Sequence, residues 1–226
     1  VVDQIKSSEG VYGAVGVIQG LPRISVGDTL IKPLGGAPTL ALNFEQETQE
    51  LSGFQTVEGR APGSGEAMVD IDTAAKYDIA VGDTITIRSL QPEEDFEVSG
   101  ITRWGEDNGG GAVFVLVDTV TAQRLFDYPD SFLAITVAAQ PGVDEEQLAN
   151  QLTNELPSGF EAVTSDVVAS EFSDQFDIFI TIFQNALLVF AAVALIVSAF
   201  IINNTFAIVL GQRIKELGLL RAVGAT

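Results

Sequence analysis

Hydrophobic and polar residues follow two different patterns along the chain, one before about residue 165 and one after it. In the first part, short apolar runs alternate with turn residues, which is typical of strands joined by loops that contain Gly and Pro. Helical spacing of the apolar residues predicts three helices, at Thr73–Ile79, Thr119–Phe126 and Asp144–Leu156. Strands are expected at Val11–Gln19, Thr39–Phe44, Ala67–Ile71, Thr84–Ser89, Phe96–Arg103, Ala112–Val117, Leu133–Ala138 and Phe160–Thr164. The fold class is therefore α+β and rich in strands, with a βαβ unit predicted over residues 133–164.

The second part contains a long run without any charged residue, Gly or Pro, from Ile178 to Leu210. Within residues 178–202, sixteen of the twenty-five residues are Ile, Leu, Val or Phe. As a helix that stretch alone would be about 38 Å long, whereas the hydrocarbon core of a bilayer is about 30 Å thick. We therefore expect a transmembrane helix. The alternative is a fully buried core helix, which a domain of this size seldom contains.

The expected helix starts before the apolar run and stops after it. Thr164, Ser165 and Asp166 offer an N-cap at its start. At the other end we expect Gly211 to end the helix at the membrane edge, because a glycine lets the chain turn there. A short helix can restart at Gln212, with Gly224 available to end it.

Five phenylalanines along this helix recur at helical spacing and share one face. They are Phe172, Phe176, Phe179, Phe183 and Phe190, and the first four form the expected seam. One interpretation is a seam against a second helix, which continues above the membrane as a stalk. The other is a row of lipid-facing aromatic side chains, and the spacing favours neither.

Charged residues, like hydrophobic ones, are distributed unevenly between the two parts of the chain. The chain has 31 acidic and 11 basic residues, a net charge of -20. Residues 1–171 hold 28 of the acids and 8 of the bases, which is the whole of that charge. A nucleic-acid partner is therefore not expected, because the basic footprint that binds phosphates is missing. The basic residues after the apolar run, Arg213, Lys215 and Arg221, place that end in the cytoplasm by the positive-inside rule. The acidic domain is then extracytoplasmic.

Few residues in the first part suggest a catalytic, metal-binding or phosphate-binding site. The chain has no Cys and no His, which excludes thiol and imidazole catalysis and a Cys/His zinc site. Asp70 and Asp72 could hold a hard cation, but two solvated carboxylates are the simpler interpretation. The run from Gly109 to Gly111 lacks the Lys and Ser/Thr of a phosphate-binding loop, and we expect a flexible hairpin loop there. We predict no catalytic residue, no metal and no cofactor.

The residues after the apolar run have the composition of a small protein–protein contact. Arg213 and Glu216 are three apart and can pair or reach a partner. Leu217 and Leu220 adjoin them as an apolar patch, and the planar guanidinium of Arg221 suits a carboxylate anchor. The alternative is that the basic residues only hold lipid phosphates.

The segment IINNTFAIVLGQRIKELGLLRAVGAT, residues 201–226, resembles the FtsX-like permease family, the membrane subunits of ABC transporters that include the MacB type. The first part resembles the MacB-like periplasmic core domain of that family. The residues that carry this second likeness are Val57–Pro62, Glu66–Asp70, the Ala80–Asp83 turn and Phe96–Gly100.

The resemblance implies an extracytoplasmic core domain over residues 1–165, a stalk and transmembrane helix over 166–211, and the start of a cytoplasmic coupling loop over 212–226. It implies that Arg213, Glu216, Leu217, Leu220 and Arg221 contact an ATP-binding subunit, which holds the ATPase activity. Further partners would be a second permease half, membrane lipids and an extracytoplasmic substrate or protein. The chain begins at Val1 without Met, and we expect it to be part of a longer protein.

Two other functions stay open at this point. The first is a transducer that transports nothing and instead regulates a cell-wall hydrolase or a sensor through its outer domain. It would use the same coupling segment, so the sequence does not separate it from a transporter. The second is a membrane-anchored enzyme, which the lack of His and Cys disfavours.

Overall fold

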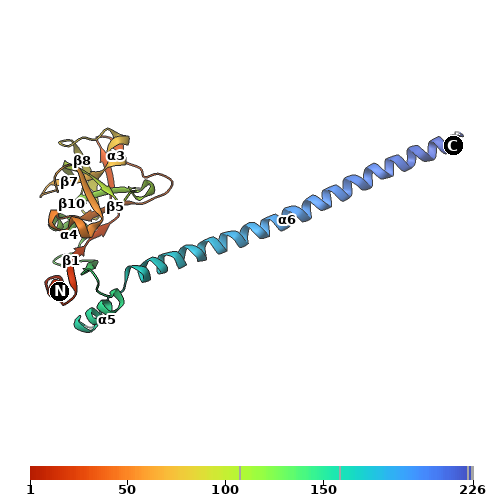
Figure 1. Cartoon of the computed structure of the whole chain (residues 1–226). Coiled ribbons are helices and arrows are strands. Elements are labelled where there is room, and N and C mark those ends of the chain that lie inside the picture. The colour runs from red at the N-terminus through yellow and green to blue at the C-terminus, as the bar shows by residue number, and fades with distance from the viewer. Residues whose placement is uncertain (107, 158, 223, 225–226) are drawn as a thin grey trace. The chain divides into compact units, whose positions relative to one another are not determined.

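The computed structural model describes residues 1–106, 108–157, 159–222 and 224, and for residues 48, 169, 171–180, 220 and 221 it describes the backbone alone. The chain separates into two compact units, Val1–Ala162 and Val163–Thr226 (Figure 1). The first unit holds all the strands among the described residues, and the second consists of one helix. Each unit is described by itself below.

The first unit is built on a nine-stranded mixed sheet. At its centre β7 pairs in parallel with β9 on one side and antiparallel with β10 on the other. The strand order is β2 (Gln19–Gly20), β5 (Thr39–Asn43), β10 (Val113–Val117), β7 (Glu66–Asp70), β9 (Glu94–Trp104), β8 (Thr84–Arg88), β3 (Arg23–Val26) and β4 (Thr29–Leu30), and β6 (Phe54–Gly59) also pairs with β9.

Strand β10 explains why the sequence carries a continuous apolar run here, because all five of its residues are buried. Val113, Val115 and Val117 enter the larger core cluster, together with helices α3 (Ile71–Tyr77) and α4 (Thr119–Phe126). Phe114 and Leu116 point the other way, into a smaller cluster. Successive side chains of a strand face opposite sides of the sheet. A strand with cores on both sides therefore needs apolar residues at every position.

A second, two-stranded sheet pairs β1 (Val11–Val17) with β11 (Ala134–Ala139) in antiparallel fashion. Two helices contribute to its core, α1 (Val2–Lys6) and α5 (Glu145–Glu155), through Ile5, Leu148 and Leu152. An isolated strand pair is only marginally stable in water, so this helical cover is what stabilises the pair. The remaining short elements are η1 (Gln46–Thr48), α2 (Gln49–Ser52) and η2 (Asn108–Gly111).

The α+β class and most of the expected elements are confirmed, but the last expected strand is wrong. Residues 160–164 form neither helix nor strand, so the βαβ unit over residues 133–164 is absent. There the N–H of Ala162 donates to the hydroxyl of Thr153 in α5 at 2.9 Å instead of joining a ladder. A parallel pair connected through a helix occurs elsewhere, since β7, α3 and then β8 precede β9 along the chain. Strands β3, β4 and β6 were not expected.

The second unit is formed by α6 (Ser165–Ala222), a helix of 58 residues that begins within the expected N-cap segment. The expectation that Gly211 ends it is wrong: Gly211 lies inside the helix and does not adopt a positive φ. Glycine in a helix interior costs only about 1 kcal/mol relative to alanine. The strong helix formers around it, Leu210, Gln212 and Arg213, offset that cost. Gly224, just past the end of the helix, does adopt a positive φ of 91°.

The continuity of α6 predicts a single interspin distance across Gly211. The native chain has no Cys, so pairs of spin labels can be placed cleanly. Labels at Ser198→Cys and Leu217→Cys, nineteen residues apart, should lie about 28 Å apart along the axis. The matched control pair, Leu187→Cys and Phe206→Cys, has the same spacing within the charge-free run. Both pairs should give one narrow distribution with the same mean by double electron–electron resonance, and a shorter or broader distance across Gly211 alone would contradict a continuous helix.

Candidate functional site

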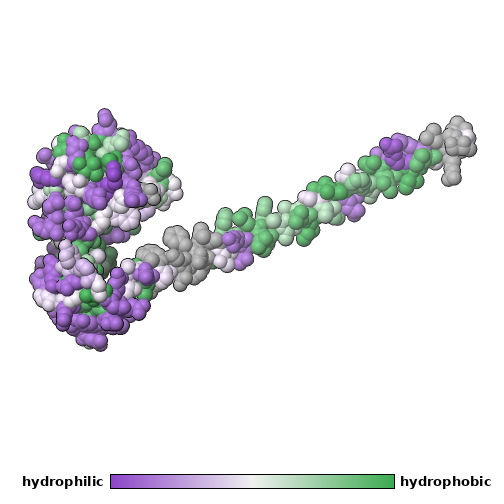
Figure 2. Space-filling model, viewed as in Figure 1, coloured by the Kyte–Doolittle hydropathy of each residue, from purple (hydrophilic) through white to green (hydrophobic). Residues whose placement is uncertain are grey.

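Most of the described side chains of α6 are apolar and exposed. The stretch Thr181–Leu219 is long and apolar enough to cross a membrane, and none of it is buried. Phe190, for example, is 72 % exposed and Leu195 is also 72 % exposed. Figure 2 shows hydrophobic residues along most of the helix and a hydrophilic group near its C-terminal end. The helix is therefore not a buried core helix, and its surface matches the interior of a bilayer.

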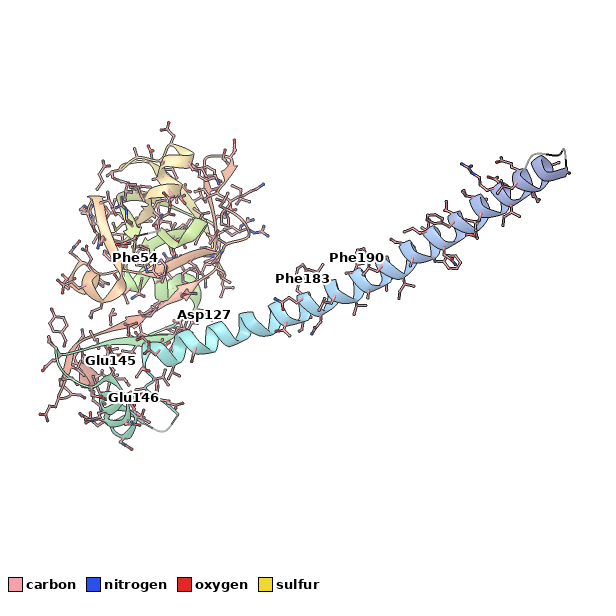
Figure 3. All side chains as sticks on the ribbon, turned by 45° about the vertical axis from the view of Figure 1, so that its right-hand side comes forward. Phe54, Asp127, Glu145, Glu146, Phe183 and Phe190 are labelled. Atoms are coloured by element: carbon pink, nitrogen blue, oxygen red, sulfur yellow. The ribbon has the colours of Figure 1, made fainter. Side chains whose placement is uncertain are left out.

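The expected phenylalanine seam is only partly visible. The side chains of Phe172, Phe176 and Phe179 lie outside the described residues. Phe183 is described and is 58 % exposed. It projects from the same side of α6 as Phe190, seven residues on (Figure 3). Whether this stripe meets a second helix or lipid stays a prediction.

The expected coupling residues occupy the last turns of α6. Arg213, Glu216 and Leu217 are all exposed, and the side chains of Leu220 and Arg221 lie outside the described residues. Among the side chains that the structure describes, Arg213 and Glu216 form no ion pair. Their charges are therefore available to a partner. This arrangement is suited to binding.

Asp70 is neither a cation ligand nor a solvated carboxylate, which corrects both interpretations of the sequence. It is fully buried and caps the N-terminus of α3. Its Oδ1 accepts from the N–H of Thr73 at 3.0 Å and from Nδ2 of Asn108 at 2.9 Å, while Oδ2 accepts from the N–H of Phe114 at 2.9 Å. Asp72 is exposed and accepts from the same amide of Asn108 at 3.1 Å. Within the described residues, no cluster of three or more potential metal ligands occurs.

Asn108 is the partner that sequence reasoning missed. It is buried, and its Oδ1 accepts from the N–H of Trp104, so it joins the end of β9 to Asp70. The signal available in the sequence was an Asn directly before the glycine run. That run was expected to be a flexible hairpin loop, which is wrong, since β9 and β10 do not pair with each other. Gly109 leaves room for the Phe114 ring, which a Cβ would meet at 2.5 Å.

The loop between β6 and β7, which carries part of the family resemblance, is closed by an ion pair. Arg60 bonds both carboxylate oxygens of Glu66, one of them from Nη1 at 2.6 Å. The N–H of Gly63 donates to the same carboxylate at 2.9 Å. The hydrogen bonds from Arg60 and Gly63 hold the pKa of the Glu66 carboxyl below its usual value. Beside this loop, Gly59 has a φ of 75°, and a Cβ there would meet the Ser99 carbonyl at 2.2 Å.

A sheet-rich domain that continues in the same chain into a helix able to cross a membrane defines a membrane-anchored domain. Comparisons with known proteins give the family. The model of the MacB-like periplasmic core domain family matches residues 1–155. The chain belongs to this family.

The relatives and a solved structure agree with that assignment. An ABC transporter permease protein of Mycobacterium tuberculosis is 28 % identical over 183 residues, which are 80 % of this chain and 20 % of the relative. An ABC transporter permease of Methanocaldococcus jannaschii is 28 % identical over 154 residues, 66 % of this chain and 36 % of the relative. The chain thus spans between a fifth and two fifths of these relatives. The periplasmic region of MacB from Actinobacillus actinomycetemcomitans shares the fold, with a TM-score of 0.53 and 13 % identity over 76 % of this chain and 80 % of that one.

The expected resemblance to FtsX-like permeases with a MacB-like core domain is confirmed by these matches. They also confirm that the protein resides in a membrane and carries an extracytoplasmic segment. The boundaries expected at residues 165 and 211 remain predictions.

Replacing the buried carboxylate of Asp70 should destabilise the domain strongly. In Asp70→Asn an amide group replaces one acceptor oxygen, so a buried N–H donor loses its partner, at a cost of about 2–4 kcal/mol. The control is Asp72→Asn, at an exposed carboxylate that shares the Asn108 amide, for which we expect less than about 1 kcal/mol. The free energy of unfolding can be followed by the fluorescence of Trp104, the single tryptophan. Equal losses in the two variants would show that Asp70 does not have this role.

The ion pair of Arg60 and Glu66 predicts a pH dependence of stability. Because the folded-state pKa of Glu66 is lowered, the pair stabilises the fold above the ordinary pKa of a glutamate and stops doing so as the pH falls through the lowered value. Glu66→Gln should therefore be less stable than the wild type at pH 7, and the difference should shrink on acidification. The control, Glu58→Gln, changes an exposed glutamate in β6, the strand that precedes β7 along the chain. Urea unfolding at a series of pH values measures both, and a difference for Glu66→Gln that does not depend on pH would contradict the assignment.

Proposed function

We propose that this chain is the extracytoplasmic domain and the second membrane helix of an ABC transporter permease, and that it couples ATP hydrolysis by a partner subunit to movement of that domain. The substrate would be exported or extracted on the outer side. The observation that carries the proposal is the continuity of α6 from Ser165, next to the sheet-rich unit, to Ala222, beyond the charge-free run.

An unbroken helix is a suitable mechanical element. At 1.5 Å per residue, 58 residues span about 87 Å, far more than the hydrocarbon core of a bilayer. Its backbone hydrogen bonds run through the membrane without a break. A displacement at one end therefore reaches the other without being absorbed by a hinge. In this proposal the apolar run contacts membrane lipids and a second permease half, and the phenylalanine seam lies on the side of that second half.

The contact with the ATP-binding subunit is assigned to one face of the last turns of α6. On a helix of 3.6 residues per turn, positions 213, 216, 217, 220 and 221 fall on one side. Position 215 falls on the opposite side. The proposed contact combines the charges of Arg213, Glu216 and Arg221 with Leu217 and Leu220. Alternatively, a helix that only anchors to lipid phosphates needs its cations and has no use for Glu216.

A pair of matched charge reversals separates these two roles. Glu216→Lys should leave insertion and expression unchanged, because it adds a basic residue at a cytoplasmic end. It should abolish stimulation of ATP hydrolysis by, or copurification with, the partner ATP-binding subunit. Lys215→Glu, one position away on the opposite face, should leave both readouts intact.

The opposite pattern would refute the coupling proposal. If Glu216→Lys keeps its ATPase stimulation and complex yield while Lys215→Glu loses insertion, the segment acts as a lipid anchor alone. Leu220→Asp provides a second variant on the proposed contact face. It should behave as Glu216→Lys does.

A further inference from the structure

A small pocket opens on the surface of the nine-stranded sheet, near its β4 edge. It has a volume of about 120 Å³ and is lined in part by Arg23 and Ser25 of β3, Thr86 and Arg88 of β8, and Glu93. It is distant in sequence from α6 and belongs to none of the features discussed above. Its lining also includes Ile24 and Leu30, but most of it is polar or charged.

Two arginines lie directly opposite each other in this pocket. Arg23 pairs in register with Arg88 across the antiparallel β3–β8 ladder. The neighbouring residues Ile24 and Ile87 are fully buried, so alternation along the strands puts both arginines on the outer face. Like charges at directly opposed positions destabilise a sheet. The β3–β8 register therefore places two like charges opposite each other.

The lack of a carboxylate partner for one of these two arginines is unexpected in so acidic a domain. Acids outnumber bases 28 to 8 in residues 1–171, so a carboxylate partner is easy to supply. Arg88 has one, since its Nη2 lies 2.7 Å from Oε1 of Glu93, in an exposed pair. Among the described residues, the side chain of Arg23 has no hydrogen bond or ion pair. One guanidinium is thus unpaired in a very acidic domain, beside a second one that already holds a carboxylate.

We propose that this pocket binds an oxyanion group, a phosphate or a carboxylate, between Arg23 and Arg88. A guanidinium presents several N–H donors in a plane and matches two oxygens of such a group. An anion between the two arginines would also remove their mutual repulsion. The hydroxyl of Ser25 faces the same pocket and can donate a further bond, whereas that of Thr86 already donates to Asp95 at 2.7 Å. Glu93 occupies part of the site and competes with the incoming anion for Arg88.

The test uses the full chain in detergent micelles, titrated in parallel with inorganic phosphate and with acetate at constant ionic strength set by chloride. The readout is the side-chain Nε–Hε NMR signals of the arginines. Saturable shifts of the Arg23 and Arg88 signals with either anion would support the pocket. Arg23→Gln should weaken binding about fivefold, the upper range for an exposed charge pair. It should leave the domain at least as stable, because it removes a like-charge contact.

Two controls make the outcome decisive. Arg103→Gln removes another exposed arginine of the same domain and should leave the affinity unchanged. Glu93→Gln should raise the affinity, because it frees Arg88, whereas Glu97→Gln removes the same charge without contacting an arginine of the pocket and should change it less. Absence of saturable shifts with both anions would overturn the proposal. So would equal losses in Arg23→Gln and Arg103→Gln, which would indicate only general ionic attraction.

Discussion

Among the described residues of the sheet-rich unit, Asp70 is the only buried acidic residue, and three elements converge on its carboxylate. An ionised group inside a protein is costly unless its oxygens are hydrogen-bonded. Here α3, η2 and β10 each supply a donor, through Thr73, Asn108 and Phe114. Because β7 lies between β9 and β10, this group fixes where the helix starts, where the glycine-containing turn passes and how far β10 extends. Asp70 is therefore a structural centre, and function has to be sought elsewhere in the molecule.

The elements that could be predicted from sequence are those whose signal is local. Helix α4 was expected at its observed bounds, Thr119–Phe126, and in the structure Asp118 caps it and part of one face is buried. Strand β10 could be predicted because it is a continuous apolar run. Strands β3 and β4 were missed because they are short and only Ile24 in them is buried. The expected strand at residues 160–164 failed for a different reason: its β-branched and aromatic residues fit a strand, but Ala162 bonds to the Thr153 side chain instead of to a neighbouring strand.

The candidate sites show the same difference between local signals, which the sequence contains, and long-range contacts, which it does not show. The charge-free run was a sufficient signal for the apolar helix, since length and composition alone decide whether a helix matches a bilayer. The prediction at Gly211 was wrong because a glycine permits a turn without requiring one. A cap or a tight backbone contact is also needed to favour the turn over continued helix. The partners of Asp70 come from positions 3, 38 and 44 residues away. Of these partners, only the nearest, the capping N–H of Thr73, could be inferred from neighbouring residues in the sequence. The opposed arginines of β3 and β8 required the strand register, which the sequence did not reveal.

The two units are held together by different kinds of contact, and this difference affects how each unit would respond to a mechanical force. In the sheet-rich unit, contacts cross between distant segments, so that a force on one strand is shared through Asp70 and the cores on both faces of β10. In α6 every backbone hydrogen bond is local, and the apolar surface gains nothing from any one rotational position in lipid. Such a helix can shift or rotate in the bilayer at low cost while it stays straight. Under the proposed function, this combination of a stiff domain and a continuous helix would transmit motion rather than absorb it.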